Sequence, residues 1–156
     1  MRTLVALGAV TLALALFPVD ARADLQLIFN RALANPGERA TAFYGRRGTG
    51  RWFPSGVTSG VRVYFVPMGL AKSALNQRST GLPRNKRIIP LGPLVRDRRH
   101  FAALRFRVPR VRPGDYTTGF LCLPCARPRG AFFTSAPPGE RWSGRRYDLI
   151  IRIRRR

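Results

Sequence analysis

Two cysteines spaced as Cys-x-x-Cys, Cys122 and Cys125, form the sharpest chemical motif in this chain. Redox enzymes with this spacing place the first cysteine at a helix N-terminus, which lowers its pKa and leaves a reactive thiolate. Here the motif closes an apolar, strand-like segment, and the residues that follow, 126–130 (Ala-Arg-Pro-Arg-Gly), are a poor helix start. We therefore expect a local disulfide, as is common in exported proteins. Thiol-redox activity and metal handling are the alternatives, although two cysteines alone cannot complete a tetrahedral metal site.

The chain has one histidine, His100, which follows the polar turn Arg96-Asp97-Arg98-Arg99. Asp97 is spaced to pair with it, but the sequence contains no Gly-x-Ser-x-Gly or comparable setting for a nucleophile. The acidic residues lie far apart in sequence, so paired carboxylates for acid–base catalysis are not indicated. We expect a histidine in a surface turn, no catalytic site, no bound metal and no cofactor.

Net charge is the most unusual bulk property of the chain. It has 29 lysine and arginine residues against 7 aspartate and glutamate residues, for a formal charge of +22. Lys72 and Lys86 are the only lysines. GC-rich coding would explain the preference for arginine, but it does not explain the shortage of acidic residues. A domain with this imbalance attracts polyanions.

Seven arginines at strand faces or strand ends are the candidate anion-binding residues, because arginine forks bind phosphate and carboxylate through two hydrogen bonds. They are Arg62, Arg105, Arg107, Arg110, Arg112, Arg152 and Arg154. We expect the partner to be an anionic polymer or the envelope surface; the alternative is a solvated surface that keeps the domain soluble. No helix suited to reading DNA is apparent, so sequence-specific nucleic-acid binding is not expected.

Short strands bounded by glycine or proline must position these side chains. In residues 102–108 apolar residues alternate with Arg105 and Arg107, which predicts one buried and one solvated face. Pro90 and Pro93 confine the apolar residues 88–95 to a sheet edge or a connecting segment. About seven such strands predict an all-β sandwich, with an open five-stranded barrel as the alternative. Comparable strand signals occur at residues 25–29, 39–44, 61–66, 116–123 and 147–153.

The segment Arg112-Pro113-Gly114-Asp115-Tyr116-Thr117 resembles the tyrosine corner of immunoglobulin-like domains, in which the tyrosine hydroxyl bonds to backbone a few residues upstream. Together with residues 61–67, 90–94 and 104–125, it is similar to small, mostly uncharacterised exported proteins of GC-rich bacteria in which a sandwich strand ends in Cys-x-x-Cys. The resemblance implies an immunoglobulin-like β-sandwich with Tyr116 as a structural tyrosine corner. It implies no activity, because this fold hosts many functions. Unlike antibody domains, the chain has both cysteines on one strand, where they cannot bridge two sheets.

Residues 1–23 have the pattern of a signal peptide: a positive start at Arg2, an apolar run over residues 4–17, and small residues at Ala21 and Ala23. The apolar run is shorter than the roughly 20 residues that span a bilayer, so an uncleaved anchor is the less favoured alternative. Cleavage would leave residues 24–156 as one immunoglobulin-like domain with a basic C-terminal tail. We expect this domain to be monomeric, not to span a membrane, and to be secreted, periplasmic or attached to the cell envelope.

These features favour a non-catalytic exported interaction or adhesion module, whose basic surface suits anionic polymers of the envelope or the extracellular medium. There are two alternatives. One is an envelope thiol-redox or metal-handling protein that uses the Cys-x-x-Cys motif, and the other is a purely structural domain of an envelope assembly.

Overall fold

The computed structural model describes residues 26–44, 60–71, 81–82, 84–98, 100–122 and 131–154. The expected signal peptide, Cys125 and the last two arginines of the basic tail lie outside these residues, and Cys122 is described for its backbone alone. The expected disulfide therefore also lies outside the described part of the chain.

The described residues form two β-sheets and one short 3-10 helix, as the all-β interpretation of the sequence predicts. The strands are β1 (Ile28–Phe29), β2 (Leu33–Ala34), β3 (Arg39–Tyr44), β4 (Val61–Pro67), β5 (Ile89–Pro93), β6 (Val95–Arg96), β7 (Ala102–Arg107), β8 (Gly114–Cys122), β9 (Ala131–Thr134) and β10 (Ile150–Ile153), and the helix η1 spans Met68–Leu70. In the described ranges, no helix is long and apolar enough to cross a membrane.

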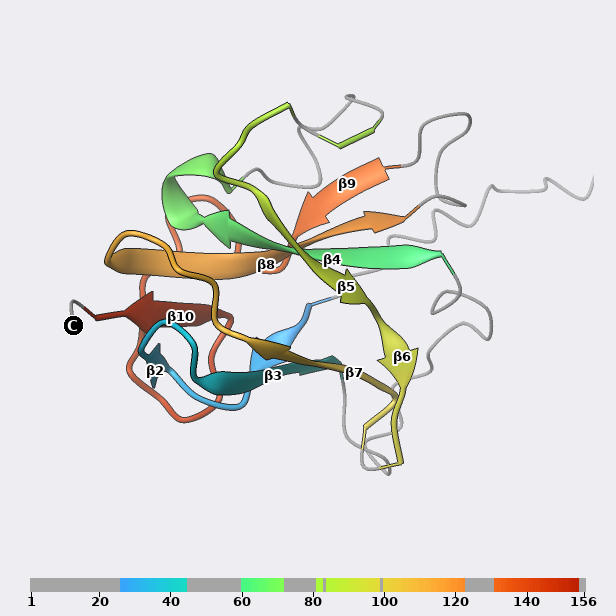
Figure 1. Ribbon diagram of the computed structural model, residues 1–156, viewed down its shortest axis with the longest axis horizontal. Helices are drawn as coiled ribbons and strands as arrows, with labels where there is room; N and C mark the ends of the chain where they lie inside the picture. The colour runs from blue at the N-terminus through green and yellow to red at the C-terminus, as the bar shows by residue number, and fades with distance from the viewer. Residues whose placement is uncertain are drawn as a thin grey trace, which may run out of the picture.

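The smaller sheet has the order β1-β3-β7-β6, and the larger has the order β2-β10-β8-β4-β5 with β9 also paired to β8 (Figure 1). The strand pairs are antiparallel except β2 with β10, which is parallel. Strand β8 is central to the larger sheet: it pairs with β4 along one edge, and with β10 and β9 along the other. As the prolines predict, β5 is an edge strand, and the chain then crosses to the smaller sheet as β6.

Apolar side chains from both sheets fill the space between them. Leu104 and Phe106 of β7 are buried while Arg105 and Arg107 are exposed, so the alternation predicted for this strand is confirmed from Leu104 on; Ala103, on the same face as the two arginines, is buried as well. Phe65 of β4 is fully buried; its ring stacks on Tyr116 of β8 with centroids 4.6 Å apart. The Phe65 ring also lies 6.2 Å from that of Phe106, which joins the two sheets. Burial of these aromatic rings, together with the aliphatic side chains around them, stabilises the fold.

A second, smaller apolar cluster covers the outer face of the larger sheet. It contains Tyr64, Val66, Ile88, Leu121 and Phe132. As a result β4 has apolar residues buried on both faces, so its alternation is incomplete over its second half.

A buried polar network lies where β9 ends beside β8. The hydroxyls of Thr118 and Ser135 are 2.6 Å apart, and the backbone N–H of Leu27 donates to the Ser135 oxygen at 2.9 Å. The Thr117 hydroxyl donates to the carbonyl oxygen of Leu149 at 2.9 Å. Because each of these buried polar groups has a partner, the network fixes the path of the chain between β9 and β10 at little cost in desolvation.

Candidate functional site

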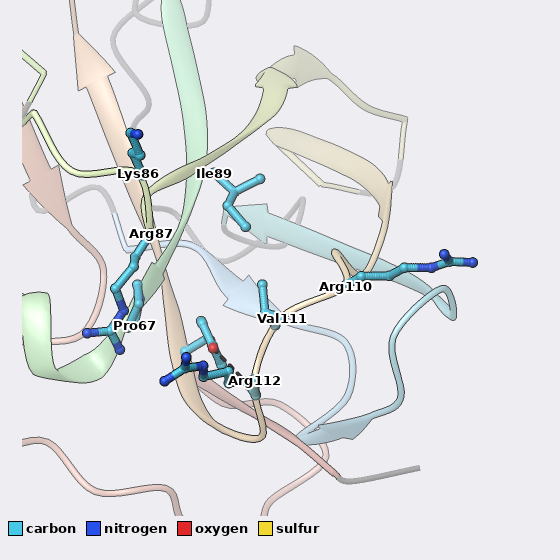
Figure 2. Close-up of a pocket in the computed structure, with 8 residues that line it drawn as sticks. Pro67, Lys86, Arg87, Ile89, Arg110, Val111 and Arg112 are labelled. Carbon is cyan, nitrogen blue, oxygen red and sulfur yellow. Dashed lines mark hydrogen bonds between the residues drawn. The ribbon is translucent and has the colours of Figure 1, made fainter.

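A basic pocket lies at the end of the larger sheet where β4 stops and β8 starts. Its volume is about 460 Å³, within the range of small-ligand pockets. The lining comes from the end of β4, the start of β5 and the β7–β8 connection (Figure 2). The lining residues are Pro67, Lys86, Arg87, Ile89, Arg110, Val111, Arg112 and Tyr116. We call this the basic pocket.

A tight turn before β5 supplies Lys86 and Arg87. The side-chain oxygen of Asn85 accepts a hydrogen bond from the Arg87 N–H at 2.9 Å, and the Asn85 carbonyl accepts one from the Ile88 N–H at 3.0 Å. Ile88 is buried in the outer apolar cluster, whereas Lys86 and Arg87 are exposed. The turn therefore holds the two cations at the surface directly before the strand begins.

The β7–β8 connection supplies Arg110 and Arg112, and Tyr116 holds it in place. The phenol of Tyr116 donates a hydrogen bond of 2.8 Å to the carbonyl oxygen of Arg112, four residues upstream. The start of the connection is fixed by Val108, whose N–H donates to the Glu38 carbonyl at 2.8 Å. The backbone that carries Arg112 is thus tied to the ring that stacks on Phe65 in the core.

The pocket is strongly electropositive. Four of its lining residues are cationic, and among the described residues that line it none is acidic. None of the four forms a salt bridge within the described part of the chain. Figure 2 shows Arg87 and Arg112 extending to the same side, beside Pro67, whereas Arg110 extends away from them.

The pKa of Tyr116 reflects this setting. Burial raises it above its ordinary value because the phenolate would lose hydration, while the charges of Arg87 and Arg112 act in the opposite direction and lower it. The net shift is upward, so Tyr116 stays a neutral hydrogen-bond donor at physiological pH. Arg87, Arg112 and Tyr116 line the same pocket.

The seven arginines proposed from the sequence do not gather in one place. Arg110 and Arg112 lie in the basic pocket. Arg62 on β4 and Arg154 after β10 are exposed and form no salt bridge with any described residue. Arg107 donates to the carbonyl oxygen of Gly37 at 3.3 Å, beside a shallower hollow around the turn at residues 35–38.

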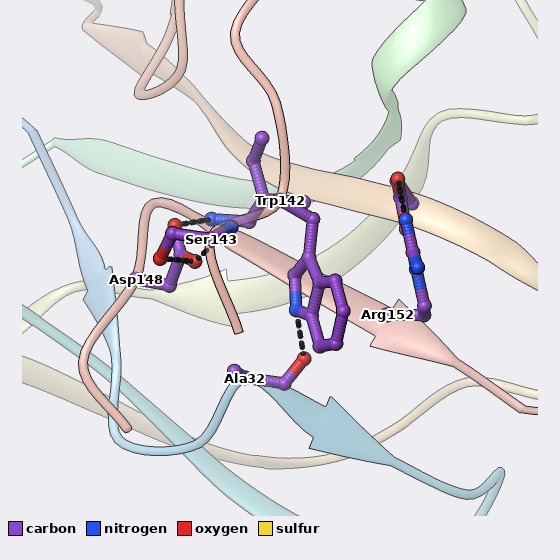
Figure 3. Close-up of polar contacts among 7 residues, drawn as sticks. Ala32, Trp142, Ser143, Asp148 and Arg152 are labelled. Atoms are coloured by element: carbon purple, nitrogen blue, oxygen red, sulfur yellow. Dashed lines mark hydrogen bonds and ion pairs between the residues drawn. The ribbon is translucent and has the colours of Figure 1, made fainter. Parts of the chain in front are cut away.

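Arg152 contacts other side chains of the domain and is not free to bind a ligand. Its guanidinium donates two hydrogen bonds to Asp115, at 2.7 and 2.8 Å, and lies 4.1 Å from the centroid of the Trp142 ring (Figure 3). These hydrogen bonds raise the pKa of Arg152 above its ordinary value. The Trp142 indole N–H donates to the carbonyl oxygen of Ala32 at 2.8 Å, so this stack fastens the segment before β10 to the sheet edge.

Arg105 likewise forms a salt bridge, and its partner is Asp97. The Asp97 carboxylate lies 3.0 Å from Arg105 and 3.0 Å from the Nδ1 atom of His100. The His100 ring packs on Phe43 with centroids 4.2 Å apart. No group of three or more histidine, cysteine, aspartate or glutamate side chains that could hold a metal ion occurs in the described ranges.

Lys86 and Arg87 were not among the site residues predicted from the sequence. Both lie at the end of the least regular part of the sequence, where no strand pattern assigns a direction to a side chain. The one local signal is Asn85, since asparagine often bonds to backbone two residues ahead in turns.

Comparisons with protein-family models, with curated proteins and with solved structures find no match to this chain.

Proposed function

We propose that this protein is a non-catalytic, exported interaction module whose basic pocket and surrounding surface bind anionic polymers of the cell envelope or the extracellular medium. The observation that carries this proposal is the basic pocket itself, which four cationic side chains line with no acidic residue among the described lining residues. Cations without anionic partners repel one another, and a bound polyanion relieves that repulsion.

We also propose that the domain is an immunoglobulin-like sandwich. The order β1-β3-β7-β6 corresponds to strands A-B-E-D of that fold, and β10-β8-β4-β5 corresponds to G-F-C-C′. In this correspondence Tyr116 lies near the start of strand F, and its bond to the Arg112 carbonyl has the geometry of a tyrosine corner. Loops at the ends of such sandwiches are common binding surfaces, because a rigid scaffold holds them.

Export is proposed from the sequence of residues 1–23, which has the three parts of a signal peptide. A binding role is favoured over catalysis because the chemistry in the basic pocket is limited to positive charge. The phenol of Tyr116 is kept neutral, and guanidinium groups stay protonated near neutral pH, so they cannot act as bases.

A salt-dependent retention experiment tests the proposal. The exported chain, residues 24–156, is applied to a heparin column and eluted between about 50 and 200 mM salt, where counterion release predicts a steep loss of affinity. Two double variants of equal charge are compared: Arg87→Gln/Arg112→Gln in the pocket, and Arg62→Gln/Arg154→Gln outside it.

We expect the pocket variant to elute at lower salt than the control variant. The slope of log affinity against log salt should also fall by about 0.7 to 0.9 for each contacting arginine that is removed. Absence of retention, or retention that does not depend on salt, would refute the polyanion proposal. Equal losses in the two variants would show that the basic pocket is not the binding surface.

A further inference from the structure

We propose that the basic pocket holds one phosphate monoester group between Arg87 and Arg112, with the carbon-bearing part of the ester against Ile89 and Val111. This inference rests on the proposed anion-binding function and adds to it a ligand class and a binding geometry.

The guanidinium groups of Arg87 and Arg112 extend to the same side of the pocket, and the charges of both lower the pKa of the Tyr116 phenol. Both charges would therefore attract an anion bound on that side of the pocket. Neither Arg87 nor Arg112 has a salt-bridge partner in the part of the chain that the structure describes. A phosphate monoester carries close to two negative charges near neutral pH and presents three acceptor oxygens. It can therefore accept hydrogen bonds from two arginine forks at once, whereas a carboxylate has two oxygens and is well matched to one fork.

The four cationic side chains of the pocket are donors and have no acceptor atoms. The Tyr116 phenol donates its hydrogen atom to the Arg112 carbonyl, so its oxygen is the one side-chain acceptor among the described lining residues. A ligand rich in N–H or O–H donors would find few side-chain acceptors here. A ligand made of acceptor oxygens is the matching chemistry.

The remaining lining is apolar. Ile89 and Val111 are half-buried, and Pro67 is buried beside Tyr116. Figure 2 shows the side chains of Ile89 and Val111 pointing toward each other beside Arg87 and Arg112, and the part of an ester that follows the phosphate would lie against them. A volume of about 460 Å³ has room for a phosphate and a ring-sized substituent.

Both arginines stand on backbone that is fixed before a ligand arrives. The Arg87 N–H bonds to the side chain of Asn85, and the Arg112 carbonyl bonds to Tyr116. Because the backbone is already ordered, binding has to order the two side chains alone, which favours affinity for a single small group.

Calorimetric titration of the exported chain at constant ionic strength tests the inference, with phenyl phosphate, inorganic phosphate, phenyl sulfate and benzoate as probes. We expect saturable 1:1 binding of phenyl phosphate, about tenfold tighter than inorganic phosphate because the ring covers the apolar wall. Phenyl sulfate and benzoate should bind more weakly than phenyl phosphate, since each carries a single charge. Arg87→Gln and Arg112→Gln should each weaken phenyl phosphate binding about tenfold, and Arg62→Gln should leave it unchanged.

A phosphate monoester can belong to a glycan or to a lipid, and competition experiments separate these sources. Glucose 1-phosphate and vesicles that contain phosphatidate are each tested for displacement of phenyl phosphate. Displacement by the sugar phosphate supports a glycan source, and displacement by the vesicles supports a lipid source. Displacement by neither overturns the ester assignment.

The two proposals fail in distinguishable ways. Retention on heparin without saturable binding of phenyl phosphate, or with binding that is equal in the Arg112→Gln variant, overturns the phosphate site and leaves the polyanion function standing. Loss of both retention and phosphate binding overturns both proposals. Circular dichroism of each variant checks that it is folded.

Discussion

Replacing Tyr116 by phenylalanine removes one hydroxyl group and leaves the ring that stacks on Phe65 in place. The lost interaction is the 2.8 Å hydrogen bond to the Arg112 carbonyl. A hydrogen bond between neutral groups contributes about 1 kcal/mol net to folding. We therefore expect Tyr116→Phe to lower the free energy of unfolding by about 1 kcal/mol, which corresponds to about 4 °C in Tm for a domain of this size.

The same substitution should alter the dependence of stability on pH. Burial raises the pKa of Tyr116 in the folded protein above the ordinary value of about 10 that it has when unfolded. As pH rises past 10, the phenol loses its proton in the unfolded chain before it does so in the folded protein. The protonated phenol therefore contributes to the stability of the folded state. This contribution is complete below about pH 10 and is lost as pH rises through the folded-state pKa. Tyr116→Phe removes it.

Urea unfolding at about pH 8 and again above pH 10 measures both effects. Tyr64→Phe is the matched control, because Tyr64 lies in the same sheet, is 6% exposed against 5% for Tyr116, and its hydroxyl makes no hydrogen bond with any described residue. The difference between wild type and Tyr116→Phe should shrink at high pH, and Tyr64→Phe should stay close to wild type. The reasoning is refuted if the two variants lose equal stability, or if the Tyr116→Phe difference is the same at both pH values.

Two further predictions concern the larger sheet, and thermal or urea unfolding tests each. A Cβ atom at Gly119 would lie 2.5 Å from the Cζ atom of Phe132, which is 2% exposed, so Gly119→Ala should cost about 1 to 3 kcal/mol through overpacking. Gly69→Ala is its control because a Cβ there meets no atom within 4 Å; equal effects of the two substitutions would contradict the packing argument. Ser135→Ala removes the acceptor of the buried Leu27 N–H and should cost about 1 to 3 kcal/mol, whereas a neutral result would mean that this N–H finds another partner.

Local patterns were sufficient to predict the strands whose two faces differ. Strand β7 could be read from its alternation, because side chains point to opposite faces at a period of two residues. The prediction for β4 was less complete. Val61, Val63 and Phe65 are buried as the pattern indicates, but Tyr64 is buried as well, under the ring of Phe132 at 5.8 Å. That contact joins strands far apart in sequence, and no local pattern encodes it.

The candidate site was harder to predict than the fold, because the state of each arginine depends on distant residues. Arg152 is paired with Asp115, 37 positions away, and Arg105 is paired with Asp97. An outward-facing arginine that has such a partner looks the same in the sequence as one that has none. The turn that carries Arg87 has no strand periodicity, so no local pattern places it beside the β7–β8 connection. The two come together because β4 pairs with both β5 and β8.

Three acidic residues of the described chain lie beside arginines on or near the sheets and not in the basic pocket. Asp115, Asp97 and Glu38 are each within salt-bridge distance of an arginine on or beside a strand. The arginines of these pairs are exposed, and the pairs lower the positive potential along the sheets. No comparable acid lines the basic pocket in the described part of the chain, so the potential is concentrated where the Lys86–Arg87 turn meets the β7–β8 connection. A uniformly basic surface would attract polyanions everywhere. A pocket with fixed backbone, and with two guanidinium groups that form no salt bridge with any described residue, can select one anionic group over another. The matched arginine variants and the small phosphate probes distinguish these two behaviours.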